Sequence, residues 1–457
     1  MMEKHNDNIL NIYQMPKNKN DKENIMEYDI KPSFSKYHNM PLFKYGFYYY
    51  IHQTKNKMEM FDKPEFKQRD IYKIVNPYED TVPQEDYVKQ FKDDKYKPSD
   101  DINSMSIKYF QSDRIISRAF YKLWELLMMF PLIKDGSKSI TSVHIAEAPG
   151  SFVQSVIYYR YKFASTSEYQ GDKYIATSIE PDKKSSSKKE YIPTFNEELK
   201  KIKQFRQWSY KDSDLTKTDI IDKFLSDNYD VKADLVTADG GFPWRDENFQ
   251  EQEAYILLLS EIYCGLKVQK EGGTFVLKIF ETFTEVSVKM IEILKRYYEQ
   301  VILIKPLLSR PSNSEKYLVC LNYNPSKNLK HLDKLYDTIK QANKDSNLYL
   351  TDIFPEYNID PQLDLIMKLS STKMSNEQHR QINRMISYME AGNYYGEEYR
   401  KCLVDRREAN DTWISLFYPT DKKDLNGARS IIKSMISKKL EYMKYLLEEL
   451  KNKLSSI

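Results

Sequence analysis

Short, almost continuous apolar runs recur in the middle of the chain, and each ends at turn-forming or charged residues. They are residues 142–146, 174–179, 233–238, 273–277 and 317–321. Runs of this length are typical of strands that are buried on both faces of a sheet. Apolar positions at helical spacing predict helices between them, over residues 250–270 and 285–299. This alternation predicts the α/β class, with a Rossmann-like, doubly wound and mostly parallel sheet.

The flanks of this region have other patterns, which divide the chain into three parts. We expect an N-terminal extension over residues 1–100, the α/β domain over residues 101–325, and a helical C-terminal region over residues 326–457. About the first 30 residues are polar and lack periodicity, which predicts a mobile arm. Residues 42–51 are rich in aromatic side chains and are predicted to be strand-like.

The last predicted helix has one apolar seam. Its residues follow each other in steps of three and four: Ile436, Leu440, Met443, Leu447, Leu450 and Leu454. Such a seam packs against another part of the same chain, or it docks a second copy or a partner protein. The sequence leaves both alternatives open.

The composition of the chain argues against several kinds of binding site and several cellular locations. The 457 residues include 70 Lys and Arg against 67 Asp and Glu, so no global positive field forces nucleic-acid binding. Three widely spaced cysteines, Cys264, Cys320 and Cys402, argue against a disulfide framework, and no metal-binding motif is present. No apolar run reaches the roughly twenty residues of a membrane-spanning helix, so we expect an intracellular protein without a membrane anchor.

The turn after the first predicted strand is the usual place for a cofactor in a doubly wound sheet. It consists of Glu147, Ala148, Pro149, Gly150, Ser151 and Phe152. Small residues let the backbone approach a ligand, and the following helix offers N–H groups to an anion. Glu180 follows the second strand, where it could accept hydrogen bonds from a nucleoside ribose or be a solvated loop residue. Asp214, near the end of the third, could accept from an adenine amino group.

Four charged residues are expected at the same sheet edge. Asp239 ends the fourth strand, Lys278 follows the fifth, Glu315 precedes the last, and Lys122 lies on the helix before the first. A lysine between apolar neighbours must reach solvent or pair with a carboxylate. We expect Lys122 to lower the pKa of Lys278, which would make Lys278 a base for a weakly acidic alcohol, oriented by Asp239 and Glu315.

The chain resembles a known family, the FtsJ-like ribose 2′-O-methyltransferases, over residues 105–325. The motifs are Ser117-Arg118-Ala119-Phe120-Tyr121-Lys122-Leu123, His144-Ile145-Ala146-Glu147-Ala148-Pro149-Gly150, Asp234-Leu235-Val236-Thr237-Ala238-Asp239-Gly240, Val276-Leu277-Lys278-Ile279-Phe280, and Ser309-Arg310-Pro311-Ser312-Asn313-Ser314-Glu315-Lys316-Tyr317. The resemblance implies a catalytic tetrad of Lys122, Asp239, Lys278 and Glu315, with Lys278 as the base on the 2′-hydroxyl.

The same resemblance implies S-adenosylmethionine as the cofactor, bound along residues 147–152 with Glu180, Asp214 and Asp239. His144 and Ser151 depart from the family pattern, in which an acidic residue and a second glycine are common, so the contacts to the methionine end of the cofactor are open. We expect His144 to be a core residue of its strand instead.

The residues of these motifs most resemble those of the mRNA cap branch of the family, from eukaryotes and large cytoplasmic DNA viruses. It implies methylation of a cap-proximal nucleotide of mRNA, with a capping enzyme as a candidate partner of the C-terminal helix. A viral enzyme would act in the cytoplasm or a virion, which is our preferred interpretation, and a cellular one in the nucleus. The alternatives are a ribosomal or transfer RNA ribose methyltransferase and an inactive subunit that binds RNA or a capping partner.

Two groups of residues could contact RNA or serve the fold alone. Lys183, Lys184, Lys188 and Lys189 could hold RNA phosphates or form a solvated loop. Tyr48, Tyr49 and Tyr50 could stack on a cap guanine or pack in a core or sheet edge.

Overall fold

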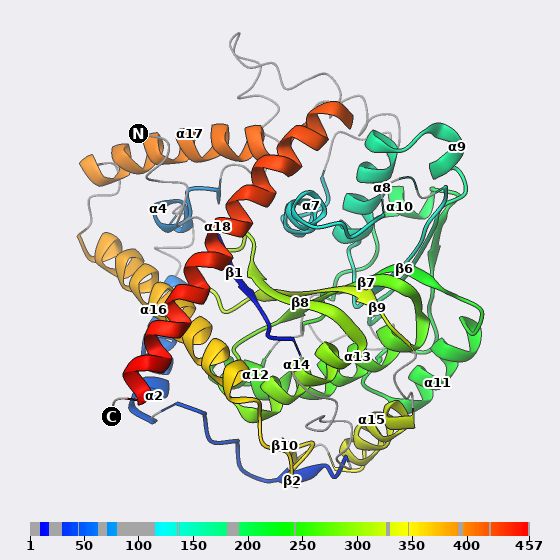
Figure 1. Cartoon of the computed structure of the whole chain (residues 1–457), viewed down its shortest axis with the longest axis horizontal. Helices are drawn as coiled ribbons and strands as arrows, with labels where there is room; N and C mark the ends of the chain where they lie inside the picture. Colours follow the sequence, from blue (N-terminus) through cyan, green and yellow to red (C-terminus); the bar gives the residue numbers. More distant parts are fainter. Residues whose placement is uncertain are drawn as a thin grey trace.

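A computed structural model of the chain describes residues 10–17, 30–43, 45–62, 71–79, 115–134, 136, 138–180, 192–241, 244–325, 330–345, 347–391, 396–419 and 422–455. Its centre is an eight-stranded sheet (Figure 1). The strands are β1 (Asn11–Gln14), β3 (Thr141–Ile145), β4 (Lys173–Thr177), β5 (Phe205–Gln207), β6 (Ala233–Ala238), β7 (Gln269–Ile279), β8 (Tyr298–Lys305) and β9 (Lys316–Tyr323). They follow the order β1-β8-β9-β7-β6-β3-β4-β5 across the sheet.

The sheet is mostly parallel, as the sequence predicts. Strands β5, β4, β3, β6 and β7 run parallel to one another. Strand β9 is antiparallel to both β7 and β8, and β1 is antiparallel to β8. The chain leaves β3 for β4 and β5 on one side and returns to β6 on the other, so the strand order reverses between β3 and β6. Ligands of such sheets bind outside the carboxyl ends of the strands near this reversal.

Helices cover both faces of the sheet and enclose two apolar cores (Figure 1). One face packs against α11 (Thr218–Asp227), α13 (Tyr255–Val268), α14 (Glu285–Tyr297) and α15 (Lys330–Ala342), and the other against α7 (Ala119–Met129), α8 (Ser151–Phe163), α17 (Glu397–Phe417) and α18 (Lys422–Ser455). The strands between them are buried on both faces, which accounts for their nearly continuous apolar sequences.

The remaining described elements are mostly shorter. They are β2 (Ser33–Ser35), α2 (Tyr45–Asn56), η3 (Lys57–Asp62), α4 (Tyr72–Val75), α9 (Thr166–Tyr169), α10 (Glu197–Lys200), η5 (Glu247–Phe249), α12 (Gln250–Glu253), β10 (Tyr349–Asp352) and α16 (Pro361–Glu390). Strands β2 and β10 form a separate antiparallel pair, so the N-terminal and C-terminal parts contact each other directly.

Two predictions for the N-terminal part are wrong. Residues 11–14 are not part of a mobile arm, because they form β1 at the edge of the central sheet, with Ile12 fully buried. Residues 45–56 form the helix α2 rather than a strand, and Tyr48 packs against the ring of Phe283. Tyr49 and Tyr50 remain exposed on that helix, whereas the four lysines at positions 183–189 lie outside the described residues.

Three residues of the seam of the last helix pack within the chain. Met443 and Leu447 are buried in the apolar core beneath the sheet, and Ile436 packs against the core on the other face. Helix α18 crosses the molecule beside β1 and α7 (Figure 1). These contacts account for part of the apolar seam, and a protein partner on this helix stays a prediction.

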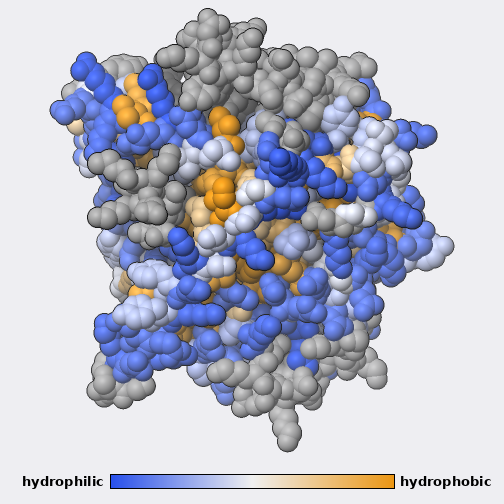
Figure 2. All heavy atoms as spheres, turned by 45° about the horizontal axis from the view of Figure 1, so that its top comes forward, coloured by the Kyte–Doolittle hydropathy of each residue, from blue (hydrophilic) through white to orange (hydrophobic). Residues whose placement is uncertain are grey.

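The face of the molecule in Figure 2 is mostly polar. Figure 2 shows one face of the molecule, on which hydrophilic residues surround a smaller group of hydrophobic ones. Of the helices that the structure describes, none combines the length and the apolar character that crossing a membrane requires.

Candidate active site

The four predicted catalytic residues lie together at the carboxyl edge of the central strands. Asp239 follows β6, Lys278 is the penultimate residue of β7, and Glu315 directly precedes β9. Lys122 projects from the first turns of α7. Because β7 and β9 pair with Lys278 opposite Tyr317, the register places Glu315 close to the end of β7.

The tetrad consists of two ion pairs. Lys122 Nζ lies 2.7 Å from Oε1 of Glu315 and donates to Oε2 at 2.9 Å. Lys278 Nζ lies 3.1 Å from Oδ1 of Asp239 and donates to the backbone oxygen of Asp239 at 2.8 Å. All four side chains are 12–17% exposed, so the pairs are shielded but reachable from solvent.

The charge state of Lys278 differs from the expectation. Burial lowers the pKa of Lys278, but the carboxylates of Asp239 and Glu315 outweigh that effect and raise the pKa above its ordinary value. The expected lowering by Lys122 is therefore wrong for the protein without ligands, in which Lys278 is an ammonium ion at neutral pH. For Glu315, burial raises the pKa, but Lys122 and Lys278 together lower it to about 2.

Three further side chains support the tetrad, although the sequence analysis gave them no role. Ser309 Oγ donates to Oε1 of Glu315 at 3.0 Å, and the Tyr317 hydroxyl donates to Oδ1 of Asp239 at 3.2 Å. The buried Lys305 donates to the backbone oxygen of Glu315 at 2.7 Å. Ser309 and Tyr317 belong to the same sequence motif as Glu315. Their place in that motif could have indicated that they belong to the site.

Glu125 anchors the loop that leads to Glu315. Its fully buried carboxylate accepts from the backbone N–H groups of Leu307 at 2.7 Å and Leu308 at 3.0 Å. The indole Nε1 of Trp413 on α17 donates to the same carboxylate at 2.9 Å. Glu125 lies one turn after Lys122 on α7. The same helix therefore supplies Lys122 and holds the loop that leads to Glu315, the ion-pair partner of Lys122.

The predicted cofactor turn lies at the point where the strand order reverses, but several of its side chains face inward. Glu147 is buried, and its Oε1 accepts from the N–H of Phe152 at 2.6 Å, so it caps α8. Burial raises the pKa of Glu147 well above its ordinary value. Ser151 and Phe152 are also buried, whereas Ala148 and Pro149 remain half-exposed.

Gly150 is required for packing as well as for backbone conformation. Its φ is +105°, and a Cβ atom at this position would lie 2.2 Å from Cδ1 of Leu199. A side chain therefore cannot fit here unless the side chain of Leu199, on α10, moves aside. The glycine keeps the turn between β3 and α8 tight.

Glu180 and Asp214 lie on neighbouring loops beyond β4 and β5. The N–H of Glu180 donates to the backbone oxygen of Asp212 at 2.8 Å, which joins the two loops. Glu180 accepts from Gln207 at 3.1 Å, and Asp214 accepts from the Thr216 hydroxyl at 2.7 Å. Both carboxylates are partly exposed, so both retain capacity to accept hydrogen bonds from a nucleoside.

His144 is a core histidine, as predicted. It is fully buried in β3, where one ring nitrogen lies 2.8 Å from Ser142 Oγ and the other 2.8 Å from Thr237 Oγ1. Burial lowers its pKa to about 3, so the ring stays neutral. Within the described part of the chain, no group of three or more His, Cys, Asp and Glu side chains could hold a metal ion.

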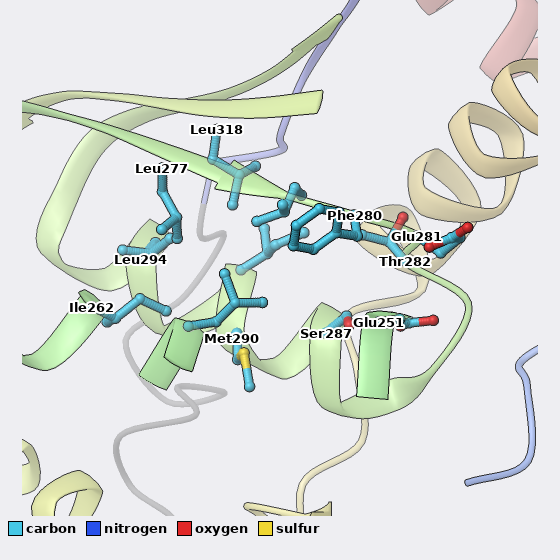
Figure 3. Close-up of a pocket in the computed structure, with 13 residues that line it drawn as sticks. Glu251, Ile262, Leu277, Phe280, Glu281, Thr282, Ser287, Met290, Leu294 and Leu318 are labelled. Atoms are coloured by element: carbon cyan, nitrogen blue, oxygen red, sulfur yellow. Dashed lines mark hydrogen bonds between the residues drawn. The ribbon is translucent and has the colours of Figure 1, made fainter. Parts of the chain in front are cut away.

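An apolar cavity lies behind the sheet, away from the tetrad (Figure 3). Leu277, Leu318, Met290 and Leu294 line it, and Glu251 lies at one end. Side chains alternate along a strand, so Leu277 points away from the face of β7 that bears Lys278. The Glu251 carboxylate accepts from the N–H groups and side chains around the start of α14. We therefore interpret this cavity as a packing void.

Comparison with known proteins shows which family part of this chain is similar to. The sequence model of the FtsJ-like methyltransferases matches residues 115–323. The cap-specific mRNA (nucleoside-2′-O-)-methyltransferase 2 of Drosophila melanogaster is 28% identical over 254 residues, which are 53% of this chain and 34% of that protein. An uncharacterised protein of Acanthamoeba polyphaga mimivirus is 26% identical over 263 residues, 54% of this chain and 31% of that protein. This chain thus spans about a third of the length of these curated relatives.

Among solved structures, a Plasmodium falciparum protein described as a ribosomal RNA methyltransferase is similar at a TM-score of 0.31 and 24% identity. The similarity covers 45% of this chain and 97% of that one. The family match coincides with the region that contains the parallel strands and the tetrad. Residues 115–323 of this chain are thus similar to the FtsJ-like methyltransferases.

Proposed function

We propose that this protein transfers a methyl group from S-adenosylmethionine to a ribose 2′-hydroxyl of RNA. One observation carries the proposal: Lys122, Asp239, Lys278 and Glu315 converge at one sheet edge, within the residues that match the family. Two lysines and two carboxylates in a shielded site suit the deprotonation and alignment of an alcohol.

Lys278 is the proposed base. As an amine it would accept the proton of the 2′-hydroxyl, while Asp239 holds its nitrogen through two oxygen atoms. Glu315, fixed by Lys122 and Ser309, adds negative charge near Lys278 and would stabilise the ammonium that forms. Because the pKa of Lys278 is raised in the protein without ligands, the reaction should accelerate as the pH rises and the amine becomes more abundant.

The residues near the strand reversal fit the proposed cofactor. Glu180 and Asp214 offer partly exposed carboxylate oxygens on adjacent loops, and Ile179 beside them is 42% exposed, which suits a ribose, an amino group and an apolar base face. When bound, S-adenosylmethionine supplies a methyl group on a sulfonium that an oxygen nucleophile can attack. The half-exposed Ala148 and Pro149 and the neighbouring Asp239 would line the path toward Lys278.

The proposed substrate is the cap-proximal part of mRNA. The Drosophila melanogaster relative is named as a cap-specific mRNA methyltransferase, which supports this substrate over ribosomal or transfer RNA. Similarity to a mimivirus protein supports the preferred interpretation of a viral enzyme. Such an enzyme would act in the cytoplasm or a virion. Both the substrate and the location are proposals for this chain.

Methyl transfer to matched short RNAs tests this proposal. The RNAs would have an N7-methylated cap, an unmethylated cap or a bare 5′ phosphate, and labelled S-adenosylmethionine would report the transfer. We expect transfer to capped RNA, with loss of at least about a hundred-fold in Lys278→Ala because a general base contributes about 10²–10⁴. Cofactor affinity should change little in that variant, since Lys278 acts on the acceptor.

Each other outcome has a distinct meaning. Retained activity in Lys278→Ala would exclude this residue as the base. Equal transfer to all three RNAs would exclude cap recognition and favour another RNA substrate. RNA binding without transfer by the unmodified protein would favour an inactive binding subunit.

A further inference from the structure

One peptide group of the active site is bound by charged or ionisable side chains at both of its polar ends. The backbone oxygen of Asp239 accepts from Nζ of Lys278 at 2.8 Å. The N–H of Gly240, which belongs to the same peptide group, donates to Oε1 of Glu261 at 3.1 Å. The peptide bond is trans, so its oxygen and its N–H point in opposite directions. The peptide between Asp239 and Gly240 therefore lies between the proposed base and a carboxyl group of α13.

Glu261 is fully buried, whereas the tetrad residues remain reachable from solvent. Its second oxygen, Oε2, is buried as well and has no hydrogen-bond partner among the residues that the structure describes. Burying a carboxyl group costs free energy that an apolar side chain of the same size avoids. Packing alone therefore does not account for a glutamate at this position.

A glycine provides the space for this carboxyl group. A Cβ atom at Gly240 would lie 2.2 Å from Oε1 of Glu261, so a side chain here would force the carboxyl group to move. At the next position, a Cβ atom on Gly241 would lie 3.6 Å from Nζ of Lys278. The two glycines thus face opposite sides of the turn, one toward Glu261 and the other toward Lys278.

Several elements contribute titratable groups around this peptide. They are Glu147 after β3, Asp239 after β6, Glu261 and Cys264 on α13, Lys278 on β7 and Glu315 before β9. Burial raises the pKa of Glu261 to about 8, so this group is mostly protonated at neutral pH and ionises in the mildly alkaline range. For Lys278, burial lowers the pKa, and the negative charges of Asp239, Glu315 and Glu261 outweigh that effect.

We propose that Glu261 is a positioning residue for the base: through the shared peptide group it fixes the oxygen that binds Lys278 and, once ionised, stabilises the ammonium form of that lysine. The inference rests on the proposed function, in which Lys278 is the base. Hydrogen bonds that share one amide polarise each other, so a carboxylate on the N–H side strengthens the bond on the oxygen side. Because Glu261 is fully buried, it acts through this peptide and not by contact with RNA or cofactor.

The pH dependence of Lys278 acetylation tests the electrostatic part in the protein without ligands. Acetic anhydride modifies the amine form of a lysine and not the ammonium form, and mass spectrometry of the peptide that contains Lys278 reports the extent. In Glu261→Gln the amide keeps an oxygen for the N–H of Gly240 but cannot ionise. We expect the modification curve of Lys278 to move toward acid by about 0.5–1 pH unit, because Asp239 and Glu315 have larger effects on this lysine.

Single-turnover methyl transfer tests the positioning part. Glu261→Leu removes the acceptor of the Gly240 N–H and keeps a side chain of similar size. We expect its rate to fall at least about tenfold at every pH, because displacement of a group that holds the base is costly. Glu261→Gln should keep most of the rate at pH 7. Above about pH 8 it should exceed the unmodified protein about three- to tenfold, since more Lys278 is then an amine.

Glu292→Gln is the matched control. Glu292 is a buried glutamate on α14 whose pKa is also raised by burial, and its Oε1 likewise has no hydrogen-bond partner among the described residues. It faces Lys295, Tyr357 and Asp360 rather than the tetrad. Its acetylation curve for Lys278 and its pH profile of methyl transfer should match those of the unmodified protein. The melting temperature identifies variants that fold normally, and Glu261→Gln tests the inference even if Glu261→Leu does not fold.

The outcomes separate this inference from the proposed function. If the unmodified protein methylates RNA but neither the acetylation curve nor the pH profile moves in Glu261→Gln, the inference is wrong and the function stands. A Glu261→Leu protein that folds normally and keeps the full rate would also overturn it. If the unmodified protein transfers no methyl group while the acetylation curve of Lys278 moves in Glu261→Gln, the function is refuted and the link between Glu261 and Lys278 is supported.

Discussion

The pair of Lys278 and Asp239 allows a quantitative prediction about the proposed base. The carboxylate of Asp239 lies 3.1 Å from the lysine nitrogen and helps to raise its pKa. Asp239→Asn removes the negative charge while keeping an oxygen that can accept from both Lys278 and Tyr317. The substitution therefore isolates the electrostatic effect from most of the geometry.

The magnitude follows from the distance. Two unit charges 3.1 Å apart attract by about 5 kcal/mol at an effective dielectric constant of about 20. Solvent and neighbouring polar groups weaken such a pair, and opposite charges in proteins shift a pKa by about 1–3 pH units, or about 1.4–4 kcal/mol. Since the carboxylate stabilises the ammonium form, Asp239→Asn should lower the pKa of Lys278 by that amount.

Single-turnover methyl transfer measured across pH is the appropriate assay, because it reports the chemical step rather than product release. The rate of the unmodified protein should rise with pH through the neutral and mildly alkaline range, as the amine fraction of Lys278 increases. In Asp239→Asn the rising limb should move about 1–3 pH units toward acid. Its plateau should be lower, because a neutral amide holds the amine less firmly.

The control variant is Asp234→Asn, whose carboxylate pairs with Lys270 at the opposite edge of the sheet. Its pH profile should match that of the unmodified protein. A rising limb that stays in place or moves toward alkaline pH in Asp239→Asn would refute the electrostatic reasoning. A rate of the unmodified protein that is independent of pH would refute the role of Lys278 as a base.

Two predictions concern stability and can be measured by chemical unfolding. Gly150→Ala should destabilise the protein by more than about 2 kcal/mol, because the glycine has a positive φ and the new Cβ would overlap a core side chain. By contrast, Gly427 lies inside α18 with open space around it, so Gly427→Ala should stabilise the protein by about 0.5–1 kcal/mol. Equal effects at the two positions would contradict this explanation. Ile12→Ala should cost about 2–5 kcal/mol, since Ile12 is fully buried in β1, and a cost below about 0.5 kcal/mol would indicate that β1 is not part of the stable sheet.

The α/β domain could be predicted well because short stretches of sequence are enough to identify its strands. Each central strand is buried on both faces, so it has a continuous apolar run that no flanking segment imitates. Parallel strands have their carboxyl ends at the same edge of the sheet. From this rule alone, the sequence predicts that Asp239 and Lys278 lie close together. The strand β8 was missed because its apolar residues follow α14 without a turn, so the boundary between the two elements has no local signal.

Other features depend on contacts between distant segments, which local patterns do not encode. Aromatic residues near position 48 favour a strand by themselves, but packing of Tyr48 and Ile51 against Phe283 stabilises a helix. The short segment at residues 11–14 becomes a strand because β8 offers it an unpaired edge.

The electrostatics of the site also depend on tertiary contacts. The sequence placed two lysines near each other and led to the expectation of a lowered pKa, whereas in the folded chain each lysine pairs with its own carboxylate, and these pairs dominate. Likewise, the ion pairs of Glu79 with Arg118 and Arg310 form only because the N-terminal segment returns to the border of the site. The sequence by itself thus determined which strands form and which functional groups share an edge. The fold alone decided how those groups are paired, because charge pairing depends on distances between side chains that are remote in the chain.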